Sequence, residues 1–371
     1  MALGMAGRTS PRVDRASAFD VSTTRFVLPR WVFAVLLVLA AIGVLWAIFG
    51  KPILQATIQG LVVGSIYVLG ASGLSLTYGI KKFANFAHGD MMTVGAYAAF
   101  TINVIVGQNI VLGFVFAAIT VALVGVFLEL AIFRRLETRG PVSALIASVG
   151  VSLVLQNAVS AIFKTNVLYL NVNPPQDFAI GATGLFFNAV KGGVTLAVSV
   201  ALILFLHFML KYTTLGKAMR ACADNLDLAR TSGINPRNVI LCTWIISGSF
   251  AAVAGVLLAV IVNVYPLLGF FVLLFIFAAV IIGGIGSPYG AMIGGLIIGV
   301  VQKLSNVVFG ALQGRVLEGG SEYEPVGAFV VMILVLLFMP EGIMGVRRHS
   351  IGGRLTALLV RHRQIEVKEP G

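Results

Sequence analysis

The sequence predicts an all-α protein: a polytopic transmembrane helical bundle of about ten spans with both termini cytoplasmic. Three observations predict this fold class. Hydrophobic residues make up 58% of the 371-residue chain and charged residues only 11%, which is too little polar surface to cover a water-soluble domain. The hydrophobic residues gather in runs of about 17 to 25, the helix length that crosses a hydrocarbon core. Lysines and arginines concentrate in alternate connecting segments.

Charged or Pro/Gly-rich breaks divide the apolar stretches from one another, and each stretch is an expected helix. The second stretch is long enough to tilt, to break or to dip back into the membrane, and its glycines supply the places where it could do so. The expected helices lie near residues 31–49, 53–80, 91–106, 110–133, 142–163, 193–210, 238–262, 269–285, 290–309 and 326–343.

Loop charge predicts the orientation, because lysine and arginine are retained on the cytoplasmic side. With the N-terminus inside, the inside segments hold 21 lysines and arginines and the outside segments hold 4. One helix missed or invented before residues 211–237 would put that basic loop on the wrong side. We therefore expect a basic cytoplasmic tail over 1–30, a transmembrane domain over 31–345 with a cytoplasmic loop at 211–237, and a basic cytoplasmic tail over 346–371. Such a protein would be a multi-pass component of the cell inner membrane.

The net charge of +12 would suggest nucleic acid as a partner if the protein were soluble. Here the basic residues lie in the loops between apolar stretches, so no nucleic-acid partner is expected and the lipid membrane accounts for the composition. The two cysteines, Cys222 and Cys242, form neither a CxxC motif nor part of a ligand cluster. We expect no disulfide and no metal site.

Several motifs that would indicate other functions are absent from the sequence. Without a GxxxxGK[ST] loop the chain is not expected to bind ATP or another cofactor directly. Neither HExxH nor a GxSxG with suitable partners occurs, so an enzyme is not expected. No regular array of arginines and no filter-like loop indicates a voltage sensor or an ion channel.

A polar cluster, Asn85-Phe86-Ala87-His88-Gly89-Asp90, separates two apolar runs. Polar groups at membrane depth are costly unless they line a cavity or pair with one another. In a functional interpretation Asp90 binds His88 or caps the next helix, and Asn85 satisfies broken backbone near Gly89. In the alternative, the cluster is a cytosolic turn and Asp90 is the N-cap of a helix that begins at Met91. The residues alone do not decide between the two.

The loop over 211–237 contains a short amphipathic helix that ends near Gly233 and Pro236. A cytoplasmic helix with such an apolar face is expected to seek a partner's groove. The alternative is a helix that lies on anionic lipid, attracted by the basic residues of the loop. The apolar face is formed by Ala218, Met219, Ala221, Cys222, Leu226, Leu228 and Ala229.

Glycine patterns indicate close helix packing. The pairs Gly60/Gly64, Gly290/Gly294 and Gly295/Gly299 have the small-xxx-small spacing that lets backbones approach in lipid. The segment from Gly283 to Gly290 is too glycine-rich for a regular helix and lacks the preceding strand of a dinucleotide loop, so it predicts a packed turn or hinge.

Several blocks of the sequence resemble the membrane permeases of branched-chain amino acid ABC importers. The first block runs through residues 60–67, 73–79 and 85–90, the second through Leu215-Gly-Lys-Ala-Met-Arg-Ala221 and Gly233-Ile234, and the last through 283–287 and Pro340-Glu-Gly-Ile-Met-Gly345. Together they cover most of residues 55–345 in the family's order. Permeases for urea and short amides share these blocks, so the solute is less determined than the type of transporter.

The resemblance implies a set of partners: a second related permease, two ATP-binding cassette ATPase subunits that use the ATP, and an extracytoplasmic solute-binding protein. Residues 216–233 would be the coupling helix seated on an ATPase subunit. The glutamate of the family's EAA segment has no clear counterpart, and Lys303 is unusual within a helix; we expect it to snorkel outward or to pair across the permease interface rather than to line the path. The matching coupling positions are Gly216, Arg220, Ala221, Ala223, Asp224 and Gly233.

The function implied by the resemblance is ATP-driven import of a small amino acid with an apolar side chain, by alternating access. Asn85, His88, Gly89 and Asp90 are candidates for the inner half of the translocation path. A self-sufficient secondary transporter or channel is the competing class, and a membrane-embedded enzyme is a third. Copurification with ATPase subunits would discriminate the first class from the second.

Overall fold

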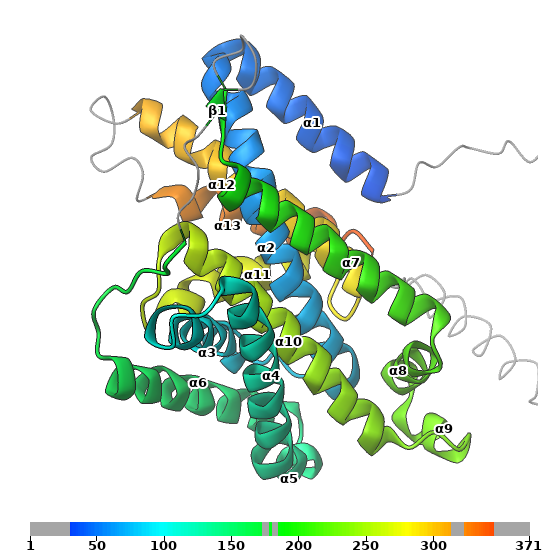
Figure 1. Ribbon diagram of the computed structural model, residues 1–371. Coiled ribbons are helices and arrows are strands. Elements are labelled where there is room, and N and C mark those ends of the chain that lie inside the picture. The colour runs from blue at the N-terminus through cyan, green and yellow to red at the C-terminus, as the bar shows by residue number, and fades with distance from the viewer. Residues whose placement is uncertain (1–29, 173–177, 180–184, 313–322, 345–371) are drawn as a thin grey trace, which may run out of the picture.

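The computed structural model describes residues 30–172, 178–179, 185–312 and 323–344 (Figure 1). The tail expected over 346–371 lies outside the described residues, and so does the tail over 1–30 except for Arg30. Every expected helix is present. The long helices are α1 (Arg30–Phe49), α2 (Lys51–Lys81), α3 (Ala87–Phe100), α4 (Ile110–Leu128), α6 (Pro141–Phe163), α7 (Thr195–Tyr212), α10 (Pro236–Val262), α11 (Leu268–Gly283), α12 (Pro288–Leu312) and α13 (Glu324–Phe338).

Shorter elements extend or connect these helices. Three π-helical segments continue α3, continue α4 and precede α7: η1 (Thr101–Ile105), η2 (Glu129–Phe133) and η5 (Ala189–Val194). The connections also hold α5 (Arg134–Leu136), η3 (Glu137–Arg139), α8 (Thr214–Asp224) and α9 (Leu226–Thr231). In the described part of the chain, the strands are two antiparallel two-residue pieces, β1 (Phe178–Ala179) and β2 (Phe186–Phe187). The all-α prediction is confirmed.

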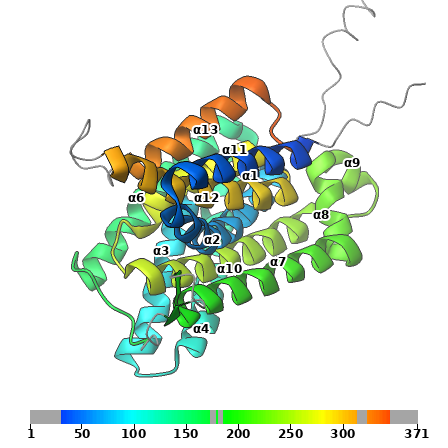
Figure 2. The ribbon, with the colours of Figure 1, turned by 90° about the horizontal axis from the view of Figure 1, so that it is seen from above.

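Helix α2 is one uninterrupted helix, so the expectation that it could break at its glycines is wrong. Its glycines serve packing instead. A Cβ at Gly60 would lie 2.6 Å from the Cα of Val300, and one at Gly64 would lie 3.2 Å from the carbonyl oxygen of Gly295. Helices α2 and α12 therefore approach backbone to backbone, as the glycine pairs predicted, and form the centre of the bundle together with α3, α10 and α11 (Figure 2).

The glycine-rich joint between α11 and α12 is a packed turn, as predicted. Gly284 and Gly286 have φ of +107° and +83°, which a residue with a Cβ adopts only at a cost. The chain after α13 returns to this joint: the amide of Ile343 donates to the carbonyl of Ile282 at 2.8 Å, and that of Met344 to Gly283 at 2.9 Å. Two blocks of sequence about sixty residues apart thus meet at one turn.

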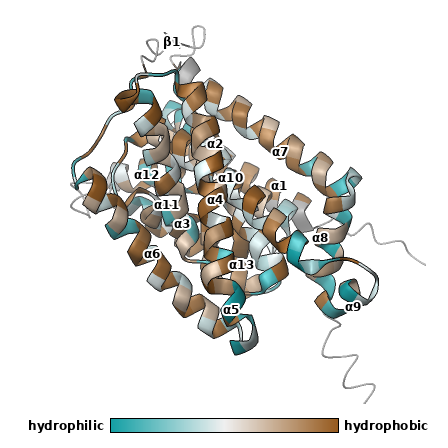
Figure 3. Cartoon of the chain, turned by 60° about the horizontal axis from the view of Figure 1, so that its bottom comes forward, coloured by the Kyte–Doolittle hydropathy of each residue, from teal (hydrophilic) through white to brown (hydrophobic). Residues whose placement is uncertain are grey.

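The periphery of the bundle is apolar. Large hydrophobic side chains are exposed along α1, α4, α6, α7 and α13, and the hydrophilic residues gather at α5, α8 and α9 (Figure 3). Six helical segments of the described residues are long and apolar enough to cross a membrane, and three shorter apolar helices accompany them. Since apolar surface on this scale is stable only against lipid, the chain is a multi-pass membrane protein.

Basic segments that the charge pattern assigned to one side of the membrane lie together. At the end of α2, Lys82 contacts Ala223 of α8, and Lys81 contacts Glu129 of η2. The charge pattern did not assign Lys191 and Lys303 to the cytoplasmic side. Both residues line a pocket together with Phe186 of β2, near the end of the molecule marked by β1 in Figure 3.

Candidate functional site

The polar cluster at residues 85–90 forms the entry into α3. The helix begins at Ala87, and the side-chain oxygen of Asn85 accepts a hydrogen bond from the Ala87 amide at 3.1 Å. Asp90 lies inside the first turn, where a carboxylate is favoured by the exposed helix amides. The alternative in which Asp90 is the N-cap of a helix beginning at Met91 is therefore wrong.

The cluster joins three helices. The Nε2 atom of His88 lies 2.9 Å from the carbonyl oxygen of Gly70 in the middle of α2. The hydroxyl of Ser152 on α6 donates to the Asp90 carboxylate, so the expected pairing of Asp90 with His88 is wrong. One turn earlier on α6, the Ser148 hydroxyl accepts from the Phe86 amide at 3.0 Å.

The cluster is buried but incompletely bonded. Asn85, His88 and Asp90 are each at most 1% exposed, which rules out a solvated turn in this conformation. Three of their polar atoms, Asn85 Nδ2, His88 Nδ1 and Asp90 Oδ1, have no hydrogen-bond partner. A buried polar group without a partner costs about 1–3 kcal/mol, so another state of the protein or a polar guest that satisfies these atoms gains that energy.

Gly89 has a packing role in the cluster. A Cβ at this position would lie 2.5 Å from the carbonyl oxygen of Gly269 on α11 and 2.8 Å from the Cβ of Leu273. Beside it the Thr93 hydroxyl accepts a hydrogen bond from the Gly269 amide at 2.9 Å. Sequence reasoning missed the partners Gly70, Ser148, Ser152 and Gly269. Only the two serines carried a signal, since their spacing of four puts them on one face of α6.

The segment 211–237 folds as two short helices with a sharp joint, which we call the elbow (α8, α9 and the residues between them and α10). Thr213 caps α8 through a bond from the Gly216 amide at 3.0 Å, and Asn225 caps α9 through bonds from the amides of Asp227 and Leu228 at 3.0 Å. Gly233, with φ of +84°, follows the end of α9. Gly216 is buried because its Cα faces the Leu210 backbone; a Cβ there would lie 2.6 Å from the Leu210 Cα.

Part of the apolar face of the elbow is covered by the chain itself, whereas Leu228 of that face is 64% exposed. Met219, Cys222 and Ala229 are buried, and α8 packs against α2, α7 and α10. The chain thus provides part of the groove for this face, and seating of the remaining part in a partner's groove stays a prediction. Burial also raises the pKa of the Cys222 thiol. Of the matching coupling positions, Arg220, Asp224 and Gly233 are exposed, Ala221 and Ala223 are half-buried, and Gly216 is buried.

The elbow is tied to the rest of the bundle by charged groups. The Lys82 ammonium donates to the Ala223 carbonyl at 2.8 Å, at the last turn of α8. The neighbouring Lys81 forms a buried ion pair with Glu129 at 2.8 Å and reaches Glu137 at 3.9 Å. The end of α2 is thus anchored to both α8 and η2.

Lys303 has a partner within the same chain. Its ammonium pairs with Glu324 at the start of α13 at 2.7 Å, and Asn306 contacts the same carboxylate at 3.4 Å. This contact was not expected from the sequence, and the outward snorkelling and the pairing across a permease interface stay predictions. In the described part of the chain, His, Cys, Asp and Glu residues form no group of three that could hold a metal ion.

Comparisons with known proteins agree with this architecture. Residues 56–339 match the family model described as branched-chain amino acid transport system / permease component. The high-affinity branched-chain amino acid transport system permease protein LivH of Escherichia coli is 36% identical over 309 residues, which cover 79% of this chain and 95% of LivH. BraD of Pseudomonas aeruginosa, described in the same words, is 35% identical over the same shares of the two chains. LivM of Escherichia coli, a permease protein of the same system as LivH, is 23% identical over 359 residues, which cover 90% of this chain and 81% of LivM.

Proposed function

Because this chain belongs to the branched-chain amino acid transport system permease family, we propose that the elbow and the buried polar cluster are the two ends of its transport mechanism. The chain is a membrane permease subunit of an ABC importer for branched-chain amino acids. The comparisons favour this function over a permease for urea or short amides. We place the chain in the cell inner membrane with about ten spans and both termini in the cytoplasm, in agreement with the loop charges.

The observation that supports this mechanism best is the continuity of α2. Its inner end carries Lys82, which holds the last turn of α8, and its middle carries Gly70, whose carbonyl oxygen faces His88. A helix with 31 residues and no break transmits a tilt along its whole length. Displacement of the elbow would therefore move the groups around the polar cluster and switch the path between its two openings.

Helix α6 covers the polar cluster from the other side. Among the membrane helices it packs mainly on α3, and Ser148 and Ser152 attach it to the cluster. Its outer face is exposed and carries Gly150 and Asn157 among apolar residues. An exposed amide is unfavourable against lipid, so we assign this face to contact with the second related permease subunit. Asn85, His88, Gly89 and Asp90 would line the inner half of the path beneath α6.

The energy would come from two separate ATPase subunits that bind the exposed face of the elbow through Arg220 and Asp224. An extracytoplasmic solute-binding protein would select the solute, so the path itself needs only weak affinity. A path with small residues and a few unpaired dipoles suits a zwitterion with an apolar side chain. A self-sufficient transporter would need neither partner.

Uptake of radiolabelled L-leucine into proteoliposomes tests this function. The reconstituted complex of both permeases and both ATPases should accumulate leucine only when the binding protein is outside and ATP is inside. The Asp90→Asn and Ser152→Ala variants should lower uptake while the complex still assembles. Leucine uptake by this chain alone, without nucleotide, would contradict the proposal, and so would unchanged uptake by both variants.

A further inference from the structure

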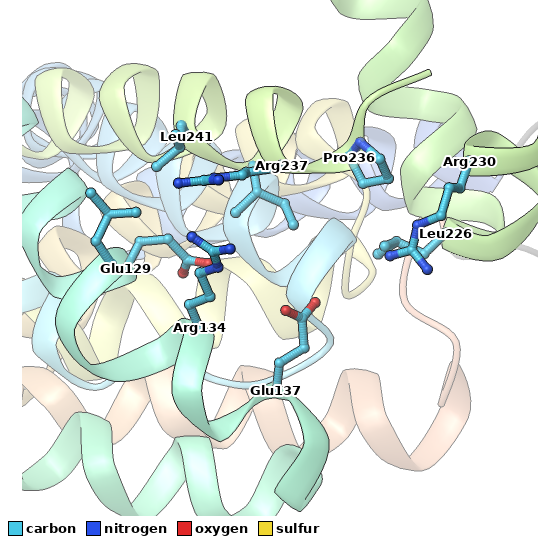
Figure 4. A pocket seen from close by; sticks show the side chains of 10 residues that line it. Glu129, Arg134, Glu137, Leu226, Arg230, Pro236, Arg237 and Leu241 are labelled. Carbon is cyan, nitrogen blue, oxygen red and sulfur yellow. The ribbon is translucent and has the colours of Figure 1, made fainter. Parts of the chain in front are cut away.

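A charged cleft lies beside the elbow, where the α4–α5 segment faces the start of α10. It has a volume of about 200 Å³, room for several waters and hence for a small organic molecule. Arg134 and Glu137 come from α5 and η3, Arg230 from α9, and Arg237 from the first turn of α10 (Figure 4). The cleft is thus lined by α9 of the elbow, by the α4–α5 segment that precedes the elbow in sequence, and by α10, which follows it.

The charges in the cleft are of both signs and are not fully paired with one another. Glu129 is 3% exposed and gives one oxygen to Lys81, but its other oxygen, Oε2, has no hydrogen-bond partner. Within the described part of the chain, the guanidinium groups of Arg134 and Arg237 make no ion pair. Glu137, by contrast, has a side chain that is 46% exposed, so a guest could find an accessible carboxylate and two guanidinium groups without ion-pair partners in one cleft.

The same cleft has an apolar side. Leu130 lies next to Glu129 in sequence, Leu226 begins α9, and Ile240 and Leu241 follow Arg237 by one turn of α10. Ile240 is 6% exposed, so this wall is part of the packed protein rather than a mobile surface. An aliphatic group beside the charges would gain burial against these side chains.

We propose that this cleft binds a free aliphatic α-amino acid as a zwitterion. The carboxylate would bind Arg134 and Arg237, the ammonium would bind Glu137, and the side chain would contact Ile240 and Leu241. A phosphate dianion or an anionic lipid headgroup would accept hydrogen bonds from the arginines. The carboxylates of both glutamates would repel such a guest.

A molecule in this cleft would restrain the elbow, because it touches α9 and α10 on one side and the α4–α5 segment on the other. On the premise of the proposed function, the imported amino acid itself would reach this cytoplasmic site once its internal concentration rises. The site would then slow further import by holding the elbow in one position.

Binding to the purified full-length chain tests the site directly. In phosphatidylcholine nanodiscs, radiolabelled L-leucine should bind, and L-isoleucine should displace it. Two analogues should fail to displace it: 4-methylpentanoate, which lacks the ammonium, and isoamylamine, which lacks the carboxylate. The R134Q/R237Q double variant should bind at least about tenfold more weakly, since it loses the charged partners of the carboxylate. The Arg135→Gln variant alters the neighbouring exposed arginine outside the cleft and should bind as the wild type does.

Transport provides the second measurement. Leucine preloaded inside proteoliposomes should slow initial uptake by the wild-type complex severalfold and should leave the R134Q/R237Q complex unaffected. Active uptake that internal leucine does not slow would overturn the regulatory role, whereas absence of any binding-protein-dependent uptake would overturn the proposed function instead. The site itself would be refuted if leucine binding were unchanged in R134Q/R237Q or if 4-methylpentanoate displaced leucine equally well.

Discussion

The buried cluster at 85–90 and the elbow at 211–237 are both polar stretches between apolar helices, yet the structure treats them in opposite ways. At the cluster, each of Asn85, His88 and Asp90 leaves one buried polar atom without a partner. At the elbow, Thr213, Asn225 and Asn235 each cap a helix start with a side-chain hydrogen bond. The two regions therefore differ in how far their polar groups are satisfied, as the proposed guest site at the cluster and the proposed lever at the elbow would require.

The largest expected effect comes from adding one methyl group at each region. Gly89→Ala puts a Cβ 2.5 Å from the Gly269 carbonyl oxygen, whereas Gly233→Ala meets no atom within 4 Å and strains only its φ of +84°. We expect Gly89→Ala to destabilise the protein by about 1–3 kcal/mol or more through overpacking, and Gly233→Ala by about 1–2 kcal/mol. Thermal unfolding in detergent measures both. Equal midpoints for the two variants would remove the packing distinction between the regions.

A reversed charge on the exposed face of the elbow should act on assembly rather than on folding. Arg220→Glu changes a side chain on the free face of α8, so we expect about tenfold less copurified ATPase with an unchanged melting temperature. Lys217→Gln, on an exposed neighbouring position outside the matching set, is the control. Normal assembly of the Arg220→Glu complex would show that the partner binds elsewhere.

Removal of the Ser152 hydroxyl should sharpen the description of the cluster. Ser152→Ala removes the hydrogen bond to the buried Asp90 carboxylate. This removal destabilises the conformation that contains the bond by about 1–3 kcal/mol. We expect initial leucine uptake by the complex to fall severalfold, while Ser143→Ala, near the start of the same helix and outside the cluster, has no effect. Identical uptake rates for the two variants would show that the Ser152–Asp90 hydrogen bond has no role in transport.

The link between the two regions is tested at Lys82. Lys82→Met keeps the length of the side chain but removes the bond to the Ala223 carbonyl at 2.8 Å. We expect ATP hydrolysis to persist and leucine imported per ATP to fall a few fold, because α2 no longer follows α8. A ratio equal to that of the wild type would exclude this bond as the connection.

The smallest effect concerns the reactivity of Cys222. Its raised pKa means less thiolate at a given pH, and its side chain is 1% exposed, so alkylation by iodoacetamide at pH 8 should be slow and should rise with pH. A cysteine placed at exposed Lys217, in a chain with both native cysteines changed to serine, should react at the ordinary rate. Fast labelling of Cys222 would mean that α8 detaches from α2, α7 and α10.

The helices and their order were readable from the sequence because each follows from a local property. An apolar run bounded by Pro, Gly or charge predicts a helix wherever it packs, and all of the expected stretches are helical. The packing role of Gly60, Gly64, Gly295 and Gly299 was also predictable, since spacing along one helix determines which residues share a face. The candidate cluster was found for the same reason: ionisable residues between apolar runs are costly and rare.

The partners of those residues were not readable. Asp90 forms a hydrogen bond with Ser152 rather than with His88, and Lys303 forms an ion pair with Glu324 of its own chain. Each contact joins two helices, and no local sequence pattern encodes the relative rotation of those helices. The same limit applies at the elbow. The apolar face predicted a groove, and α2, α7 and α10 of the same chain provide part of it.

By itself, the sequence determined the class of solvent, the helices, the family and the two regions where function was to be sought, since composition, periodicity and motif order are properties of the chain alone. Only the tertiary structure decided that the cluster is buried and underbonded, that the elbow is packed on its own bundle, and that a mixed-charge cleft opens beside it. The burial of the cluster, the packing of the elbow and the cleft all depend on which faces of helices distant in sequence are in contact. Those contacts determine the free energies of burial and of pairing.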